Sequence, residues 1–230
     1  MGRHDRDLIF SEEEKARLRA SRVLVAGLGG LGGQVLELLL RLGVGSGPGG
    51  LLRALDPDRF EESNLNRQLL ATRTSLGRPK AEAARGRAAL VDADCRVEAL
   101  EAALDSRNAS AMLDGIDLAV DCLDSVEARL VLAEACAARG LKLVHGAVAG
   151  WYGQVAVLRP RRDSLARLYR QGAGPGLEAA LGNPAFSPAL VASLEACEAA
   201  KLLAGRESAL AGRVLRLDLL EMEFEVFELG

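Results

Sequence analysis

Short apolar runs alternate with stretches of helical periodicity along most of the chain. The apolar runs predict strands at 23–26, 51–55, 97–100, 117–122, 141–145 and 154–158. The periodic stretches, several of them bounded by capping or stop residues, predict helices at 11–20, 31–42, 79–93, 107–113 and 126–139. Strands and helices that alternate in this way predict an α/β fold. We expect a doubly wound, mostly parallel, Rossmann-like sheet with right-handed crossovers.

The pattern changes after residue 158. Gly and Pro interrupt residues 159–186 without any period, which predicts a mobile crossover segment. A helix is expected next, with Ser187 as N-cap, Pro188 in its first turn and Gly205 beyond its end. The runs 214–217 and 224–229 predict a C-terminal antiparallel extension. We interpret the chain as a single domain, 1–230, with an N-terminal arm and helix (1–21), a core (22–158), the crossover segment (159–186) and the C-terminal helix and strands (187–230).

A glycine-rich turn, GLGGLG at 27–32, joins the first apolar run to the next helix. Gly27, Gly29 and Gly32 fit the GxGxxG spacing, and Asp56 ends the following run, where an acid that binds ribose belongs. Glycines let backbone N–H groups approach phosphates, and a helix N-terminus adds positive potential. The core at 22–158 is therefore interpreted as nucleotide-binding, against the alternative of a merely tight turn. The turn alone does not choose between a dinucleotide and a nucleoside triphosphate.

Two cations further along the chain favour a triphosphate. Arg67 belongs to ESNLNRQ (62–68) and Lys80 follows GRP, both shortly after the ribose-binding acid. Pyrophosphate leaves with extra negative charge that cations or magnesium must neutralise, whereas hydride transfer has no such need. The alternative is that both residues are solvated surface charges.

A third element is DCLDS at 121–125, which ends another buried run. Because ligands collect at the carboxyl ends of parallel strands, Gly29, Asp56 and Asp124 are expected to converge on one crevice. Asp124 is the candidate magnesium ligand, and its alternative is N-capping of the helix at 126–139. Asp121 is interpreted as a buried, hydrogen-bonded structural acid.

Composition narrows the choice of partner and compartment. The 29 basic and 32 acidic residues give a net charge of −3, which argues against nucleic acid and anionic membranes. No apolar run approaches the roughly 20 residues of a membrane span. Together with the charged N-terminus, this predicts a cytoplasmic protein. Four cysteines without a CxxC pair, and two histidines, predict no zinc site.

Taken together, the motifs resemble the ThiF/MoeB/HesA family, bacterial relatives of the ubiquitin-activating enzymes. The matching pieces, in the family's order, are GLGGLG (27–32), DPD (56–58), SNLNRQ (63–68), GRPKAEAA (77–84), DCLDS (121–125), HGAVAGWYGQVAV (145–157) and the stretch 182–205. The resemblance implies ATP-dependent adenylation of the C-terminal glycine of a small ubiquitin-like sulfur carrier of the ThiS/MoaD kind. Pyrophosphate would be released, and ATP and Mg²⁺ are the implied cofactors.

The resemblance also implies roles for single residues. The ATP-binding positions would be Gly27, Gly29, Gly30, Gly32, Asp56, Ser63, Asn64, Asn66, Arg67, Lys80, Asp124 and Ser125. Arg67, Lys80 and Asp124 would act in catalysis, with Asp124 on Mg²⁺. Arg6 would reach across a homodimer into the partner's active site. The absence of CxxC pairs, and of any Cys in 159–184, departs from the family pattern and allows a reaction that ends at the adenylate.

Other functions stay open at this point. One is an NAD-dependent oxidoreductase built on the same glycine turn, which would make Arg67 and Lys80 incidental. Another is adenylation of a carboxylate on a modified tRNA nucleoside, which the near-neutral charge disfavours. A catalytically inactive partner-binding module is a further alternative, supported weakly by Asp7 where the family usually has Gln.

A few remaining residues carry expectations of their own. Cys122 and Cys197 are expected to be buried small hydrophobes, and His145 a hydrogen-bonded core residue. Trp151 and Tyr152 would either line a groove for the carrier's tail or fill the core, with neither favoured.

Overall fold

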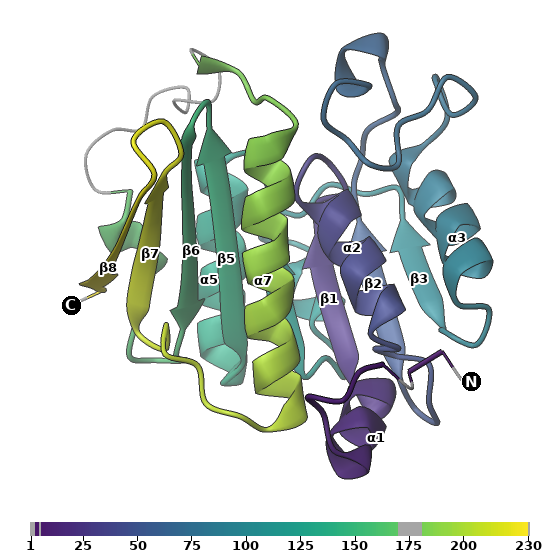
Figure 1. Ribbon diagram of the computed structural model, residues 1–230, viewed down its shortest axis with the longest axis horizontal. Coiled ribbons are helices and arrows are strands. Elements are labelled where there is room, and N and C mark those ends of the chain that lie inside the picture. The colour runs from purple at the N-terminus through teal and green to yellow at the C-terminus, as the bar shows by residue number, and fades with distance from the viewer. Residues whose placement is uncertain (1–2, 5, 170–180, 230) are drawn as a thin grey trace.

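A single mixed sheet forms the centre of the computed structural model, which describes residues 3–4, 6–169 and 181–229 (Figure 1). Its strands are β1 (Arg22–Ala26), β2 (Leu51–Leu55), β3 (Val97–Leu100), β4 (Leu118–Asp121), β5 (Lys142–Ala149), β6 (Tyr152–Leu158), β7 (Arg213–Asp218) and β8 (Glu223–Glu228). They lie in the order β3-β2-β1-β4-β5-β6-β7-β8. Pairs from β3 to β5 are parallel and pairs from β5 to β8 are antiparallel. The predicted mostly parallel sheet with an antiparallel extension is confirmed.

Helices cover both faces of this sheet (Figure 1). The core on one face is closed by α1 (Glu12–Ala20), α2 (Gly32–Arg41), α3 (Lys80–Val91) and α7 (Phe186–Ala204). The core on the other face is closed by α4 (Ala109–Met112), α5 (Val126–Arg139) and the short 3₁₀ helix η2 (Leu165–Arg167). A second 3₁₀ helix, η1 (Glu62–Asn64), lies in the loop after β2.

The central strand β1 shows why the apolar pattern located the sheet. Side chains alternate along a strand, so Val23 and Val25 pack beneath α2 while Leu24 and Ala26 pack beneath α5. All four side chains are fully buried. A strand that is buried on both faces has a continuous apolar run as its sequence signature.

The order of the strands creates a crevice at one edge of the sheet. β1 leads into α2 on one face, whereas its neighbour β4 leads into α5 on the opposite face. Connections that diverge in this way leave a space outside the carboxyl ends of the two strands. Residues that follow β1, β2 and β4 are therefore delivered to the same place.

The hairpin of β5 and β6 extends further than predicted. The expected strands were 141–145 and 154–158, but the pairing continues to Ala149 and Tyr152. Gly146 permits this extension, because a Cβ there would overlap the carboxyl group of Glu195 on α7. Since β5 is parallel to β4, the hairpin tip at Gly150 and Trp151 lies at the same edge as the crevice.

Two predicted helix ends are wrong. Ser187 is not an N-cap, because α7 begins at Phe186 with Ala185 in the capping position. The Ser187 hydroxyl instead donates to the carbonyl oxygen of Gly150, at 2.6 Å, and so ties α7 to the hairpin tip. The helix expected at 107–113 covers only Ala109–Met112. The reason is that the backbone N–H groups of Arg107 and Asn108 donate to the Asp105 carboxylate, which holds these two residues in a turn.

The end of the chain completes the sheet. β8 is the last strand in the order, and all six of its residues are exposed. Of the expected crossover segment, residues 170–180 lie outside the described part of the chain. Within the described part, no helix combines the length and the apolar character that crossing a membrane requires.

Candidate active site

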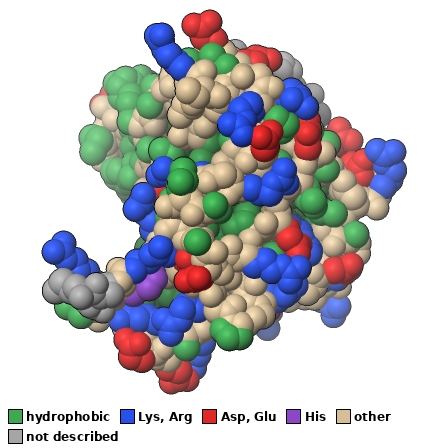
Figure 2. All heavy atoms as spheres, turned by 90° about the vertical axis from the view of Figure 1, so that its right-hand side faces the viewer, with side chains coloured by type: hydrophobic (Ala, Val, Ile, Leu, Met, Phe, Trp, Pro, Cys, Tyr) green, Lys and Arg blue, Asp and Glu red, His purple; other side chains and the backbone are tan. Residues whose placement is uncertain are grey.

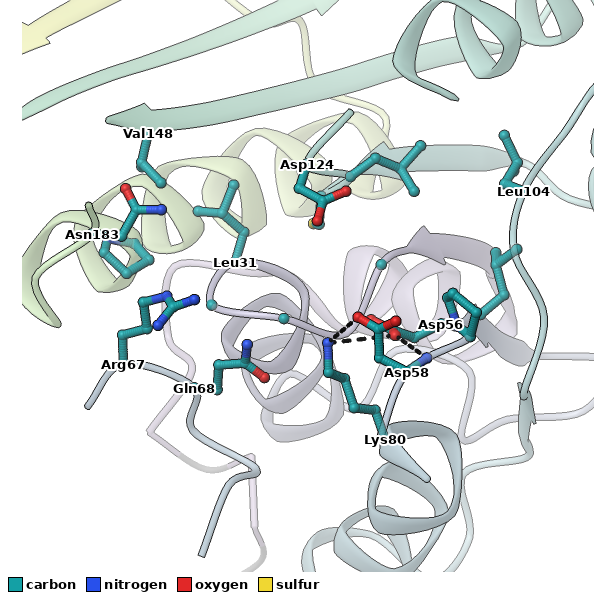
Figure 3. A pocket seen from close by; sticks show the side chains of 18 of the residues that line it. Leu31, Asp56, Asp58, Arg67, Gln68, Lys80, Leu104, Asp124, Val148 and Asn183 are labelled. Atoms are coloured by element: carbon teal, nitrogen blue, oxygen red, sulfur yellow. Dashed lines mark hydrogen bonds and ion pairs between the residues drawn. The ribbon is translucent and has the colours of Figure 1, made fainter. Parts of the chain in front are cut away.

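The crevice at the carboxyl edge of the sheet holds a cavity of about 240 Å³ (Figure 3). Of the residues predicted to bind ATP, those that line it are Gly27, Gly29, Gly30, Asp56, Arg67, Lys80 and Asp124. They follow the ends of β1, β2 and β4, or lie in the longer loop after β2 and at the start of α3. The predicted convergence of Gly29, Asp56 and Asp124 is confirmed.

The glycines of the turn serve two different purposes. Gly27 has φ +92°, and a Cβ there would lie 2.6 Å from the carbonyl oxygen of Cys122. A Cβ at Gly32 would overlap the Gly27 carbonyl oxygen, so Gly32 is required for packing and does not line the cavity. Gly29 and Gly30 border the cavity, where the first turn of α2 lacks a side-chain cap. A helix start of this kind attracts anions.

Asp56, Asp58 and Lys80 form an ion cluster on one side of the cavity (Figure 3). The Lys80 Nζ lies 2.8 Å from Asp58 Oδ2 and 3.5 Å from Asp56 Oδ1. Asp56 also accepts hydrogen bonds from the N–H groups of Leu28, at 2.8 Å, and Asp58, at 2.9 Å. Lys80 is only 5% exposed, so the alternative that it is a solvated surface charge is wrong. Burial raises the pKa of Asp56, and the nearby Lys80 opposes that rise.

The loop after β2 brings Arg67 to the cavity. Its Nη1 donates to the Ser63 carbonyl oxygen at 3.0 Å and to Asn66 Oδ1 at 2.9 Å. The Asn64 side chain accepts from the Glu61 N–H and caps η1, which orders the same loop. Ser63, Asn64 and Asn66 therefore shape the loop without lining the cavity.

Gln68 is a lining residue that the sequence interpretation did not assign. It is 7% exposed, and its Oε1 is buried without a hydrogen-bond partner. The feature of the sequence that could have pointed to Gln68 is its position directly after Arg67 in SNLNRQ. A buried acceptor that lacks a partner within the protein is costly, so this oxygen is available to a donor that enters the cavity.

Asp124 borders the cavity opposite the ion cluster (Figure 3). The alternative role, capping of α5, belongs to its neighbour: Ser125 is the N-cap and its hydroxyl accepts from the Ala128 N–H at 3.2 Å. Ser125 therefore does not line the cavity. Among the described residues, no cluster of three or more His, Cys, Asp or Glu side chains could by itself hold a metal ion.

A buried polar network lies beneath the cavity. Asp121 Oδ2 and His145 Nδ1 form a hydrogen bond of 2.8 Å, and both side chains are fully buried. Gln154 and Tyr169 contact His145 Nε2 at 3.1 Å each. Burial lowers the pKa of His145 even though Asp121 opposes this. The expectations of a structural Asp121 and a hydrogen-bonded core His145 are confirmed.

The cysteines divide by exposure. Cys122 is buried as predicted, and burial raises the pKa of its thiol well above the ordinary value. Cys197 is exposed, so its predicted burial is wrong. It lies one turn after the exposed Ser193 on the solvent side of α7. Burial also raises the pKa of Cys95, to about 12.

The N-terminal arm folds back on its own chain. Arg3 Nη1 lies 2.7 Å from Asp92 Oδ2, and His4 Nδ1 lies 2.9 Å from Asp7 Oδ2. Arg6 is exposed and does not line the cavity of its own chain.

The exposure of Trp151 and Tyr152, at the tip of the β5/β6 hairpin, decides whether these aromatic side chains fill the core. Trp151 is 45% exposed and Tyr152 is 46% exposed, so neither fills the core.

Comparison with known proteins identifies relatives along the whole chain. It is 36% identical over 231 residues to the SAMP-activating enzyme E1 of Haloferax volcanii, covering 98% of this chain and 84% of that protein. It is 37% identical over 237 residues to the sulfur carrier protein adenylyltransferase of Thermus thermophilus, covering 97% and 85%. It is 33% identical over 237 residues to the molybdopterin-synthase adenylyltransferase of Escherichia coli, covering 100% and 92%.

Solved structures agree on the fold. The crystal structure of E. coli MccB matches with a TM-score of 0.83 at 16% identity, covering 100% of this chain and 70% of that chain. The model of the ThiF family matches residues 4–230. Both the sequence relatives and the family model thus extend over nearly all of the chain, which therefore belongs to the ThiF family.

Proposed function

We propose that this protein uses ATP to adenylate the C-terminal glycine of a small ubiquitin-like sulfur carrier, with release of pyrophosphate. The observation that carries the proposal is the crevice, where Asp56, Lys80, Arg67 and Asp124 surround the glycine turn. The relatives are adenylyltransferases or an E1 activating enzyme by name, which supports the same reaction class.

The residues of the crevice fit ATP. Asp56, at the end of β2, is suited to the ribose hydroxyls, as in other folds of this topology. The phosphates would lie against Gly29, Gly30 and the uncapped start of α2, which together favour an anion. Lys80 and Arg67 add positive charge from two different elements of the chain. This donor set is richer in cations than binding of a dinucleotide requires.

Mg²⁺ is the proposed metal, held by Asp124 together with phosphate oxygens. A carboxylate is a preferred Mg²⁺ ligand, and Mg²⁺ commonly binds through one or two carboxylates plus substrate phosphates. When bound, the ion would neutralise charge on the triphosphate. Ser125 caps α5 and so fixes the backbone that carries the Asp124 side chain.

The chemistry needs alignment and charge neutralisation. A glycine carboxylate is ionised at neutral pH, so no general base has to remove a proton. One carboxylate oxygen forms a bond to the α-phosphorus while the bond from that phosphorus to the bridging β-phosphate oxygen breaks. The electron pair of the broken bond leaves with pyrophosphate. Arg67 and Lys80 would stabilise the charge that develops on it.

A homodimer is part of the proposal. The Arg3–Asp92 ion pair anchors the start of the arm and leaves Arg6 exposed beyond it. In a dimer Arg6 could then enter the active site of the second copy, as the family resemblance implies. We further propose a cytoplasmic, zinc-free enzyme of one domain.

The net charge of −3 favours a protein carboxylate over a modified tRNA as the substrate. On the face that carries α3 and β3, basic and acidic side chains are interspersed, without a broad patch of one sign (Figure 2). A nucleic-acid surface would need a concentrated positive footprint.

The test is ATP–pyrophosphate exchange with candidate carriers that end in Gly-Gly. We expect exchange that requires carrier and Mg²⁺, and that falls by about 100-fold or more in Arg67→Ala and Asp124→Asn. Arg73→Ala, which removes an exposed arginine of the same loop that does not line the cavity, is the matched control. Tight binding of NADH without any exchange would overturn the proposal in favour of an oxidoreductase.

A further inference from the structure

Both backbone groups of Leu123, the residue directly before Asp124, are held by buried side chains. The Leu123 N–H donates to Asp121 Oδ1 at 3.1 Å, and the Leu123 carbonyl oxygen accepts from Arg129 Nε at 2.9 Å. Asp121 is fully buried and Arg129 is 4% exposed. The carbonyl oxygen of Leu123 belongs to the peptide group that leads into Asp124. Asp121 and Arg129 therefore fix the backbone that carries the Asp124 side chain at the cavity.

The same two side chains are joined to each other through His145 and Tyr169. His145 Nδ1 lies 2.8 Å from Asp121 Oδ2, and the Tyr169 hydroxyl lies 3.1 Å from His145 Nε2. The Tyr169 hydroxyl also accepts from Arg129 Nη1 at 3.0 Å. These contacts close a ring of hydrogen bonds, which we call the Leu123 ring. It runs through Asp121, His145, Tyr169, Arg129 and the backbone of Leu123.

The donors of the Leu123 ring all point in one direction. A guanidinium only donates, so the Tyr169 hydroxyl accepts from Arg129 and its own proton is directed to His145 Nε2. A carboxylate only accepts, so His145 carries its proton on Nδ1, facing Asp121. This arrangement needs the neutral imidazole, and burial lowers the pKa of His145 although Asp121 opposes the shift. Hydrogen bonds aligned in sequence strengthen one another in a protein interior.

Five elements of the fold meet at the Leu123 ring. Asp121 ends β4, His145 lies on β5, Arg129 lies in the first turn of α5, and Tyr169 follows η2. Gln154 on β6 lies beside the ring, with its Nε2 3.1 Å from His145 Nε2 and 3.3 Å from the Tyr169 hydroxyl. Replacing buried ionic groups by apolar residues of similar volume often costs no stability, so holding the fold does not require such a network. Its convergence on one peptide group points to positioning of the residue that follows.

We propose that the Leu123 ring positions Asp124 for Mg²⁺ in the ATP complex, and that His145 and Tyr169 are positioning residues for this metal ligand. The inference rests on the proposed function, in which Asp124 holds the ion. Neither His145 nor Tyr169 lines the cavity, so both act through the backbone of Leu123 and take no part in the phosphoryl chemistry. Residues that orient a metal ligand from outside the site change metal affinity when they are removed.

The experiment measures the Mg²⁺ concentration that gives half-maximal ATP binding, by calorimetry and without any carrier. Tyr169→Phe removes one hydroxyl and opens the Leu123 ring between Arg129 and His145. It should raise that concentration by about 3-fold to 10-fold, the factor that corresponds to one hydrogen bond, and leave the Kd for ATP without Mg²⁺ unchanged. Tyr152→Phe removes the hydroxyl of the other tyrosine of the chain, which is 46% exposed. It is the matched control and should change neither quantity.

Opening the Leu123 ring at a second point should add nothing. His145→Asn keeps a donor for Asp121 and places no acceptor at the Nε2 position. The double variant with Tyr169→Phe should therefore require no more Mg²⁺ than the more affected of the two single variants.

Nuclear magnetic resonance of the imidazole nitrogens gives a second, independent readout. The chain has two histidines, His4 and His145, so their ring signals can be assigned by substitution. In the wild type, His145 should carry its proton on Nδ1 and have an unprotonated Nε2. Tyr169→Phe should shift the His145 Nε2 signal and leave the signals of His4 in place.

Each failure points to a different proposal. If Asp124→Asn leaves the Mg²⁺ requirement for ATP binding unchanged, the proposed metal role of Asp124 and this inference both fall. If Asp124→Asn raises the requirement but Tyr169→Phe does not, only this inference is overturned. The same holds if wild-type His145 carries its proton on Nε2. Far-ultraviolet circular dichroism and thermal unfolding establish that each variant is folded.

Discussion

Replacing Lys80 by Met removes a buried cation and tests how strongly the crevice depends on it. The Lys80 side chain is 7% exposed and contacts two carboxylates. The Asp58 side chain is 59% exposed, so water can solvate it when Lys80 is absent. The Asp56 side chain is 7% exposed and has no such access to water. Breaking a buried ion pair costs about 3–5 kcal/mol. Asp56 keeps two backbone hydrogen bonds, so we expect a loss of about 2–3 kcal/mol in the free energy of unfolding.

This loss should depend on pH in a defined direction. Burial already raises the pKa of Asp56 above its ordinary value of 3.8, and Lys80 opposes that rise. Without Lys80, the pKa of Asp56 in the folded protein rises further. A group with a raised folded-state pKa contributes its full stability below the unfolded pKa and loses it as the pH rises through the folded pKa. The difference between wild type and Lys80→Met should thus be small near pH 4 and reach its full value near pH 8.

Urea unfolding followed by circular dichroism over this pH range measures the difference directly. The matched control is the double variant Asp56→Asn with Lys80→Met, which removes the buried charge together with its partner. It should recover most of the lost stability near pH 8. A loss in Lys80→Met that is the same at every pH, or a double variant no more stable than the single one, would refute the electrostatic explanation.

Three further predictions concern other parts of the molecule. Gly32→Ala should lower the stability by about 3 kcal/mol or more, because its Cβ would overlap backbone, while Gly86→Ala on α3, where nothing lies within 4 Å, should raise the melting temperature slightly. Glu37→Gln should cost about 1–2 kcal/mol near neutral pH, since two arginines hold that carboxyl and lower its pKa from 4.5. The difference in the free energy of unfolding between wild type and Glu37→Gln, measured by urea unfolding, should disappear as the pH falls through the lowered pKa of Glu37. Iodoacetamide should label Cys197 in the native protein long before Cys122, and peptide mapping that finds equal rates would contradict their difference in burial.

The elements that could be predicted from the sequence are those whose ends are set by local chemistry. The helix at 126–139 was predicted with its observed bounds, and Gly140, with φ +72°, ends it as expected. Its start is capped by Ser125, whereas the sequence interpretation had considered only Asp124 for that role. Ser187 looks the same in the sequence, yet its hydroxyl bonds to Gly150, 37 positions away. Only the folded chain brings those two residues together, so the local pattern was misleading.

The candidate site likewise contains residues that could be placed from the sequence and residues that could not. Parallel strands deliver whatever follows them to one edge, which is why Gly29, Asp56 and Asp124 could be placed together in advance. Gln68 was missed because an unpaired amide oxygen is a property of the surroundings, not of the residue type. The phase of α7 that exposes Cys197 likewise depends on which side of that helix meets the sheet.

The exposed strand β8 has a consequence for self-association. As the terminal strand of the sheet it offers its outer backbone groups to any other strand, which is the usual route to fibrous aggregates. Three of its six residues are glutamates, Glu223, Glu225 and Glu228. Two such strands aligned about 4.8 Å apart would bring like charges together at neutral pH. Exchanging those glutamates for neutral residues would remove this repulsion and open β8 to edge-to-edge pairing of two copies.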